Sequence, residues 1–160
     1  MNIIMDLPQF AINYVFYQEP VINTVMDNSK FIRMIYSNQN MSLNIIFLAI
    51  NLNGVHIEKY FNKYKYTFKP ELNVNEIQQL GRIEKELLEK INIVGKTPLH
   101  RISEQIQSGS IKMFVSDSTV NNVNGDTVSN RKTAENQLII KVSGIWENEF
   151  EYGVTYKFIN

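Results

Sequence analysis

The stretch "LIIKVSGIWENEFEYGVTYKFI", residues 138–159, decides the fold class of this chain. Apolar or aromatic residues alternate with polar ones in its two halves, which is the period of an extended strand. The acidic segment "ENEFE" joins the halves, so we expect an antiparallel hairpin. Two sets of side chains should then face each other across it. They are Leu138, Ile140, Val142 and Trp146 on the first strand and Tyr152, Val154, Tyr156 and Phe158 on the second.

Two stretches nearer the start of the chain also predict strands. Residues 31–36 carry apolar side chains on both faces, which suits a strand buried on both sides. Residues 43–52 are rich in β-branched and aromatic residues and end at an Asn-Gly pair, the strongest short signal for a tight hairpin turn. We therefore expect residues 55–61 to fold back and pair with residues 46–52.

Two further strands follow, and a long polar stretch lies after the second. Residues 64–69 keep the extended pattern until Pro70, which lacks the amide hydrogen that a sheet needs. Residues 110–116 predict another strand. The stretch 117–137 shows no sustained period, and we interpret it as a mobile loop, because connections of that length inside a compact domain are usually functional or disordered.

Between the strands the hydrophobic period changes from two to 3.6, which indicates helices. Asn73 or Asn75 can cap the first helix, and the second is expected to begin at Thr97 and Pro98, since proline is favoured at the first helical position. A glycine follows each helix as a stop signal. The apolar stripes are Ile77, Leu80, Ile83, Leu87, Leu88 and Ile91 in the first helix, and Leu99, Ile102 and Ile106 in the second.

These elements predict an α+β fold, a curved antiparallel β-sheet of about six or seven strands with an inserted helix pair. The chain has 160 residues, which fits a single domain spanning residues 1–160. A hydrophobic fraction of 44% and an aromatic fraction of 11% are typical of a folded protein.

Charge and cysteine content restrict the classes of partner. The chain has 16 basic and 16 acidic residues, so nucleic-acid binding would have to depend on a local patch. The absence of cysteine excludes disulfides, thiolate metal sites and thiol nucleophiles, and it fits an intracellular protein. The longest apolar run, residues 45–50, is far shorter than the roughly 18 residues that cross a bilayer, so we expect a soluble protein with no membrane partner.

No motif predicts catalysis. His56 and His100 have no cysteine and no spaced carboxylates around them, so a zinc site is not expected. The fragment "GKT" at 95–97 lacks the glycine at position 90 that a phosphate-binding loop requires, and we interpret Thr97 as a helix cap. The serines lack a nucleophile-elbow motif. We therefore expect a non-enzymatic protein without cofactor or metal.

One local excess of positive charge coincides with aromatic residues. The stretch "KYFNKYKYTFK", residues 59–69, contains four lysines and no acidic residue. Aromatic rings stack on unpaired bases, at about 1 to 3 kcal/mol per base, while lysines neutralise phosphates. A half-buried strand with solvated lysines explains the same pattern. In an extended chain, one face would carry Tyr60, Tyr64, Tyr66 and Phe68, and the other Lys59, Phe61, Lys63, Lys65 and Lys69.

We interpret this stretch as part of a surface for single-stranded nucleic acid. The C-terminal strand repeats the combination of aromatic and basic residues, and two cations lie in the expected loop, where they could close over a bound strand. The candidate binding residues are Lys59, Tyr60, Lys63, Tyr64, Lys65, Tyr66, Lys69, Arg131, Lys132, Tyr156 and Lys157.

Three stretches resemble a group of viral proteins. They are "SLNIIFLAINLNGVHIEKYFNKYKYTF" at 42–68, "GSIKMF" at 109–114 and "IKVSGIWENEFEYGVTYKF" at 140–158. These are similar to segments of small proteins of insect large DNA viruses and virus-derived mobile elements, for which a single-stranded DNA-binding role is proposed. Together they cover about half of the chain.

The resemblance implies an OB-like barrel whose grooves hold bases against aromatic side chains. It also implies a role in viral genome replication or recombination, in the nucleus or cytoplasm of an infected host cell. By position, Tyr60, Tyr64 and Tyr66 would stack on bases, and Lys59, Lys63 and Lys65 would meet phosphates. The two helices between the strand blocks depart from the simplest five-stranded barrel.

The alternative function belongs to another class of protein. A structural or protein-interaction module could use a free strand edge or the long amphipathic helix, with no nucleic-acid binding. The sequence leaves open the choice between DNA and RNA and whether the chain forms a homo-oligomer.

Overall fold

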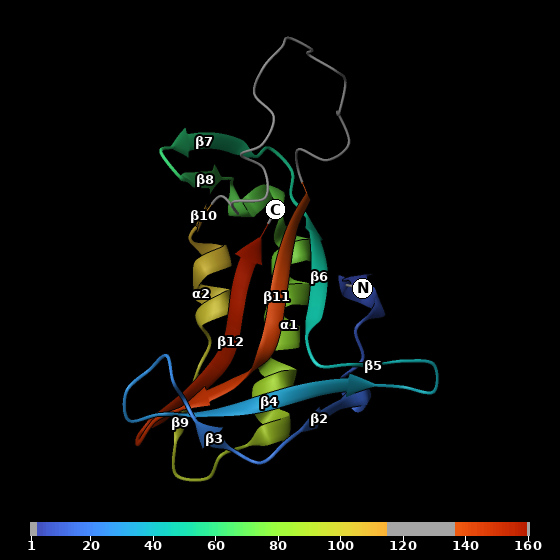
Figure 1. Ribbon diagram of the computed structural model, residues 1–160. Coiled ribbons are helices and arrows are strands. Elements are labelled where there is room, and N and C mark those ends of the chain that lie inside the picture. Colours follow the sequence, from blue (N-terminus) through green and yellow to red (C-terminus); the bar gives the residue numbers. More distant parts are fainter. Residues whose placement is uncertain (1–2, 115–136, 160) are drawn as a thin grey trace, which may run out of the picture.

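A computed structural model describes residues 3–114 and 137–159 of the chain. The expected loop at 117–137 lies, apart from Gln137, outside these residues, as do Arg131 and Lys132. The fold is mixed α+β, mostly sheet with two helices, which confirms the expected class (Figure 1). The sheets are not closed into a barrel.

Two sheets contain the described strands. The larger sheet comprises β1 (Ile4–Asp6), β2 (Val15–Tyr17), β3 (Val21–Ile22), β4 (Lys30–Ser37), β5 (Ser42–Leu43), β6 (Ile46–Asn51), β9 (Thr97–Leu99), β11 (Gln137–Glu147) and β12 (Glu151–Ile159). The smaller sheet comprises β7 (His56–Tyr60), β8 (Lys63–Thr67) and β10 (Ser110–Phe114). The α-helices are α1 (Val74–Ile91) and α2 (Arg101–Gln107), and short 3-10 turns span Leu7–Gln9, Ile12–Tyr14 and Pro70–Leu72.

Strand β11 organises the larger sheet. The expected hairpin is present, because β12 pairs with β11 along one side. On the other side, residues 137–142 of β11 pair with β6 and residues 144–147 pair with β4. A bulge at Ser143 separates the two halves, and β6 and β4 leave it in different directions (Figure 1). A Cβ on Gly144 would overlap the backbone oxygen of Ile32, so β4 can approach this closely only where β11 has glycine.

The bulge also changes which side chains share a face. Beyond Ser143, Ile145 lies opposite Val154, and Trp146 lies opposite Gly153. Because opposite residues share a face, Ile145 continues the core side of β11 and Trp146 points to the other side. The expectation that Trp146 lies with Leu138, Ile140 and Val142 is therefore wrong, since one extra residue reverses the alternation.

The expected hairpin at Asn53 and Gly54 is also wrong. Strand β6 pairs with β1 and β11, whereas β7 pairs with β8 in the other sheet. Gly54 does have the positive φ of a turn residue, at 66°. However, the Asn53 N–H donates to the Asn73 side-chain oxygen at 2.6 Å, and the Asn73 amide donates back to the Asn53 carbonyl at 3.1 Å. This exchange ties the turn to the start of α1, so the chain leaves the larger sheet.

The second helix begins later than its sequence predicts. Thr97–Leu99 forms β9, which pairs in parallel with β12, and α2 starts at Arg101. Its cap comes from α1, where the Glu84 side chain is completely buried. The N–H groups of Ile102 and Ser103 each donate to a Glu84 carboxylate oxygen at 2.8 Å, and the Ser103 hydroxyl donates at 2.6 Å. The donors left free at the start of α2 thus find an acceptor on the neighbouring helix.

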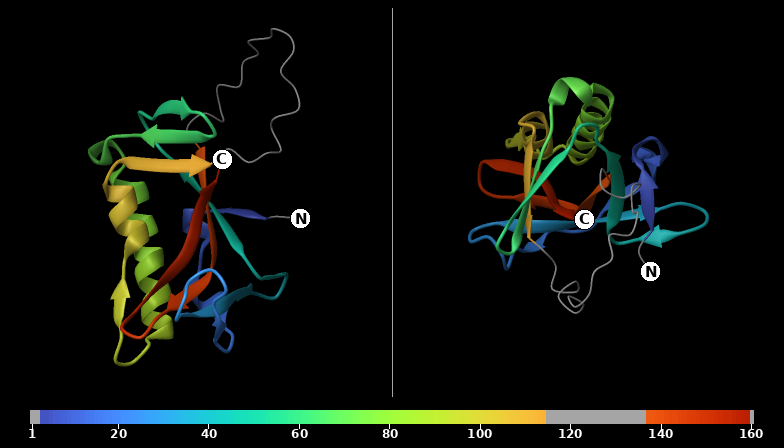
Figure 2. Two further views of the ribbon diagram at one scale, coloured as in Figure 1. Left: turned by 60° about the vertical axis from the view of Figure 1, so that its left-hand side comes forward. Right: turned by 90° about the horizontal axis from the view of Figure 1, so that it is seen from above.

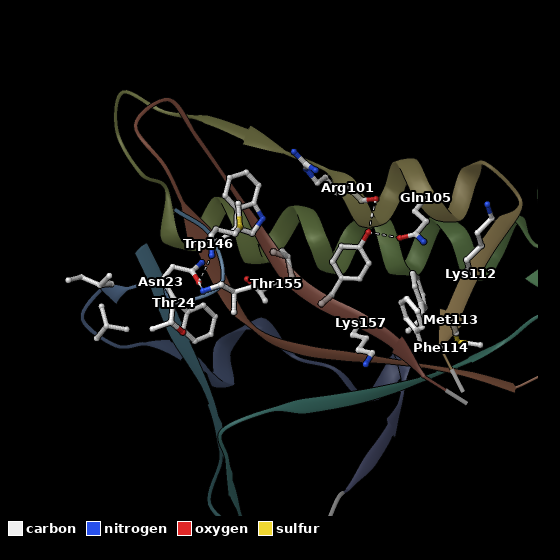
Figure 3. A pocket seen from close by; sticks show the side chains of 18 residues that line it. Asn23, Thr24, Arg101, Gln105, Lys112, Met113, Phe114, Trp146, Thr155 and Lys157 are labelled. Carbon is white, nitrogen blue, oxygen red and sulfur yellow. Dashed lines mark hydrogen bonds between the residues drawn. The ribbon is translucent and has the colours of Figure 1, made fainter. Parts of the chain in front are cut away.

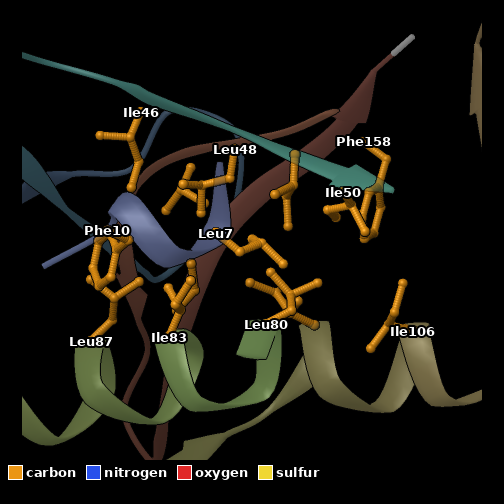
Figure 4. Packing of buried hydrophobic residues seen from close by; sticks show 14 of the residues in the cluster. Leu7, Phe10, Ile46, Leu48, Ile50, Leu80, Ile83, Leu87, Ile106 and Phe158 are labelled. Atoms are coloured by element: carbon orange, nitrogen blue, oxygen red, sulfur yellow. The ribbon is translucent and has the colours of Figure 1, made fainter. Parts of the chain in front are cut away.

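Both helices lie on one side of β11 and β12, and the smaller sheet lies across one end of this layer (Figure 2). The predicted apolar stripe of α1 is confirmed, since Leu80, Ile83 and Leu87 face Leu7 and Leu48 in a continuous core (Figure 4). The stripe is therefore covered by the core. None of the helices in residues 3–114 and 137–159 is long and apolar enough to cross a membrane.

Replacing Glu84 tests the cap. Glu84→Ala should lower the free energy of unfolding by about 2 to 4 kcal/mol, because three donors lose their acceptor in the interior. Chemical denaturation measures this loss. Glu89→Ala is the matched control, since it removes only an exposed ion pair with Lys85 at 3.7 Å and should cost less than about 1 kcal/mol. Equal losses in the two variants would show that the cap contributes little.

Candidate nucleic-acid interface

The aromatic and lysine side chains of residues 56–67 lie on a hairpin, not on one continuous strand. Strands β7 and β8 pair antiparallel, and Phe61 and Asn62 form the turn between Tyr60 and Lys63. Directly paired residues share a face of the sheet. Tyr60 therefore lies on the same face as Lys63, whereas Tyr64 and Tyr66 lie on the other face. The expectation that the three tyrosines form one row is wrong, because the turn reverses the alternation between the two strands.

The inner face of the smaller sheet belongs to the core. Tyr66 is buried opposite Ile111, and Tyr64 is half-buried opposite Met113. Of the three tyrosines expected to stack on bases, Tyr66 therefore packs inside the protein and Tyr64 packs partly against the core. Lys59 lies opposite Tyr64, with its Nζ 5.8 Å from the centre of that ring.

The outer face of the smaller sheet carries aromatic rings beside lysines. Tyr60, Lys63 and Phe114 form one row across the three strands, and the Lys63 Nζ lies 4.9 Å from the centre of the Phe114 ring. Tyr60 is 50% exposed and Phe114 60% exposed, so both rings are open to a partner. The next row consists of Glu58, Lys65 and Lys112.

The acidic member of this face already has partners. The Tyr60 hydroxyl donates to the Glu58 carboxylate, and this hydrogen bond lowers the pKa of Glu58 and raises that of Tyr60. The His56 Nε2 lies 3.4 Å from the same carboxylate. Glu58 thus has partners within β7, and it also interacts electrostatically with Lys65, which lies opposite it on β8.

A groove of about 890 Å³ adjoins this face, with Lys112 and Phe114 of β10 shared between them (Figure 3). Strand β12 and helix α2 contribute further lining residues, and residues 21–26 contribute apolar side chains. The aromatic lining residues are Phe31, Phe114, Trp146, Tyr156 and Phe158. The charged lining residues are Arg101, Lys112 and Lys157, and no carboxylate of the described residues lines the groove.

Trp146 is largely buried and contributes to the groove wall, because the bulge at Ser143 turns it to the face opposite the main core cluster. A Cβ on Gly153 would lie 2.9 Å from atoms of the indole ring, so glycine lets the ring lie flat on β12. The Arg101 guanidinium lies 5.4 Å from the centre of the ring, at a distance typical of a cation–π contact. The two side chains hold each other in position beside the open space.

Tyr156 attaches β12 to α2 within the groove. Its hydroxyl donates to the Gln105 side-chain oxygen at 2.6 Å and lies 3.3 Å from the Arg101 carbonyl. Burial, aided by the negative charge of Glu84, raises the pKa of Tyr156 to about 12, although Arg101 acts in the opposite direction. The phenol therefore stays protonated and anchors the helix that carries Arg101.

The acidic turn of the β11–β12 hairpin lies apart from these cations. Glu147 is buried and pairs with Lys96, with 3.2 Å between the Nζ and Oε2 atoms. Both residues line a separate hollow of about 420 Å³, together with Glu149. The acidic turn thus leaves the lining of the larger groove entirely cationic among its charged side chains.

The structure brings together part of the predicted set. Tyr60, Lys63 and Lys65 share the outer face of the smaller sheet, and Tyr156 and Lys157 line the groove. Lys59 is exposed at the rim of the inner face, and Lys69 lies beyond the end of β8.

Sequence reasoning missed Lys112, Phe114 and Arg101. The alternation in "SIKMF" placed Lys112 and Phe114 on one side of a predicted strand and could have indicated the first two. Nothing local indicated Arg101, because its position depends on how α2 packs against β12. Among the described residues, no cluster of three histidine, aspartate or glutamate side chains could hold a metal ion.

No family model, curated protein or solved structure matches this chain.

Titration of Tyr156 tests its role as an anchor. The phenol of the unfolded chain ionises near pH 10.0, whereas the folded protein keeps it neutral to about pH 12. Its contribution to stability is therefore complete below pH 10 and is lost as the pH rises toward 12. Denaturation at several alkaline pH values should show a falling free energy of unfolding, with a smaller slope in Tyr156→Phe. Equal slopes in the two proteins would contradict the assignment.

Proposed function

We propose that this protein binds single-stranded nucleic acid along the groove and the outer face of the smaller sheet, without catalysing a reaction. The observation that supports this most is the lining of the groove, where Arg101, Lys112 and Lys157 lie among aromatic rings and no carboxylate of the described residues is a lining side chain. A chain with equal numbers of acidic and basic residues has concentrated one sign of charge at one place. Such a site attracts a polyanion that also has flat apolar faces.

The two components of a nucleotide would have different partners. Phosphates would meet Lys112 and Lys157, whose ammonium groups release condensed counterions when a strand binds. Unpaired bases would lie against exposed rings such as Phe114 and Tyr60. Because every base has an aromatic face, this mode of binding predicts little sequence preference. A duplex hides those faces in its stack and should bind less tightly.

The resemblance to viral proteins supplies the biological setting of the proposal. It implies single-stranded DNA and a role in viral genome replication or recombination inside an infected cell. The sheets of this chain are open, so the likeness to an OB-like fold would lie in a curved strand surface that bears aromatic residues.

A second candidate function rests on the free edge of β12. This strand pairs with β9 only at Glu151–Gly153, so no described strand pairs with that edge at residues 154–159. An extended peptide could add to this edge through backbone hydrogen bonds. A protein that worked in this way would respond to a peptide partner or to its own concentration and would ignore nucleic acid.

Fluorescence anisotropy of a labelled oligonucleotide tests the proposal. Wild-type protein is titrated into single strands of about thirty bases at about 50 and 200 mM salt, with a duplex of the same sequence as competitor. We expect binding that prefers the single strand and weakens steeply with salt. No binding at low salt, together with assembly that depends on protein concentration, would favour the second candidate.

Removing two groove lysines tests the site itself. Lys112→Ala combined with Lys157→Ala should weaken binding roughly tenfold. It should also reduce the slope of log K against log salt concentration by about 1.4, because each phosphate contact contributes about 0.7 to that slope for single strands. Lys85→Ala on the solvent side of α1 is the matched control and should leave both quantities unchanged. A double variant with wild-type affinity and slope would place the binding surface elsewhere.

A further inference from the structure

The turn of the β7–β8 hairpin presents a phenylalanine to solvent. Phe61 is fully exposed, and the hairpin lies at one end of the molecule (Figure 1). Among the described residues, no aromatic pair or cation–π contact includes its ring. A large apolar side chain in this position contributes nothing to the core, and the hydrophobic effect disfavours its exposure.

The backbone at this position is also unfavourable for phenylalanine. Phe61 has a φ of +47°, in the left-handed region that glycine and asparagine tolerate and bulky residues avoid. It is the first residue of a two-residue turn, where one common type of hairpin carries glycine. The turn would form more easily without the side chain, and strained residues of this kind cluster at functional sites.

The surroundings of Phe61 fit an anion with flat rings. Tyr60 and Lys63 flank the turn, and Phe114 completes their row across the outer face. This row ends at the groove, because Phe114 also lines it. A membrane surface would need a wider apolar patch than this face offers, since lysines lie between its rings. The alternation of exposed rings with lysines along this row therefore favours nucleic acid as the partner of the tip.

We infer that Phe61 is a wedge that opens base pairs where single-stranded nucleic acid meets a duplex. The inference rests on the proposed function, in which the groove and the outer face hold the single strand. With the strand held there, the Phe61 ring at the tip would insert at the first base pair of the duplex and unstack it. Apolar side chains inserted between base steps act in this way in other DNA-binding proteins.

A forked substrate measures this activity. It carries a single-stranded tail joined to a duplex, with the fluorescent base 2-aminopurine in the first pair, where fluorescence rises when the base unstacks. We expect wild-type protein to raise the fluorescence, and Phe61→Gly to lose most of this rise while binding the tail alone within about twofold of wild type. The thermal midpoint of Phe61→Gly should not fall, because glycine accepts the positive φ.

Two variants control for the chemistry of the ring. Phe61→Trp should open the fork as wild type does, because an indole ring can insert in the same way as the phenyl ring. Phe150→Gly removes another exposed phenylalanine, from the turn between β11 and β12, and should open the fork as wild type does. Loss of opening in Phe150→Gly would mean that opening depends on a second exposed phenylalanine remote from the β7–β8 turn and would overturn the assignment to Phe61.

The remaining outcomes separate the wedge from the proposed function. Tail binding without any opening by wild type, or undiminished opening by Phe61→Gly, would overturn the wedge and leave the binding function intact. Failure of wild type to bind the tail would overturn both. Phe61-dependent flotation with anionic lipid vesicles, without opening of the fork, would identify a membrane as the partner of the tip and overturn the wedge.

Discussion

The bulge at Ser143 in β11 sets both the pairing of the larger sheet and the lining of the groove. One additional residue lets the first half of β11 pair with β6 and the second half with β4. The close approach of β4 is possible because Gly144 has no side chain. The same extra residue turns Trp146 to the face opposite the core cluster, where it becomes part of the groove lining. The curvature of the sheet and the composition of the candidate site therefore have one cause.

The cap from Glu84 positions the second wall of the groove. Helix α2 is short and cannot be stable alone, so its place depends on the carboxylate that accepts its first N–H groups and on the apolar side of Ile102 and Ile106. Arg101 projects from the first turn of this helix, and the Tyr156 hydroxyl joins the same turn to β12. A buried carboxylate thus helps to determine where an exposed cation lies.

The charged side chains are divided unequally between two neighbouring hollows. Acidic residues of the β11–β12 turn line a separate hollow, where Glu147 pairs with Lys96. The larger groove keeps only cations among its charged lining residues, and it continues onto the row of Tyr60, Lys63 and Phe114. A protein with no net charge can therefore offer a polyanion a favourable surface, because screening limits each charge to its own neighbourhood. The exposed Phe61 lies at the end of this surface, where stability alone would have favoured glycine.

The sequence by itself determined the α+β class, the C-terminal hairpin and the apolar stripe of α1, because each depends on periodicity among residues close along the chain. It also indicated Lys63, Tyr156 and Lys157, which lie on or beside the groove, as candidate site residues. Tertiary structure alone decided which face each side chain occupies. The turn at Phe61 and the bulge at Ser143 each reverse a simple alternation, so Tyr64 and Tyr66 face the core, whereas Trp146 is buried on the opposite face. Pairing of Asn53 with Asn73, and of Glu84 with α2, joins residues about twenty positions apart, and no local pattern contains such contacts.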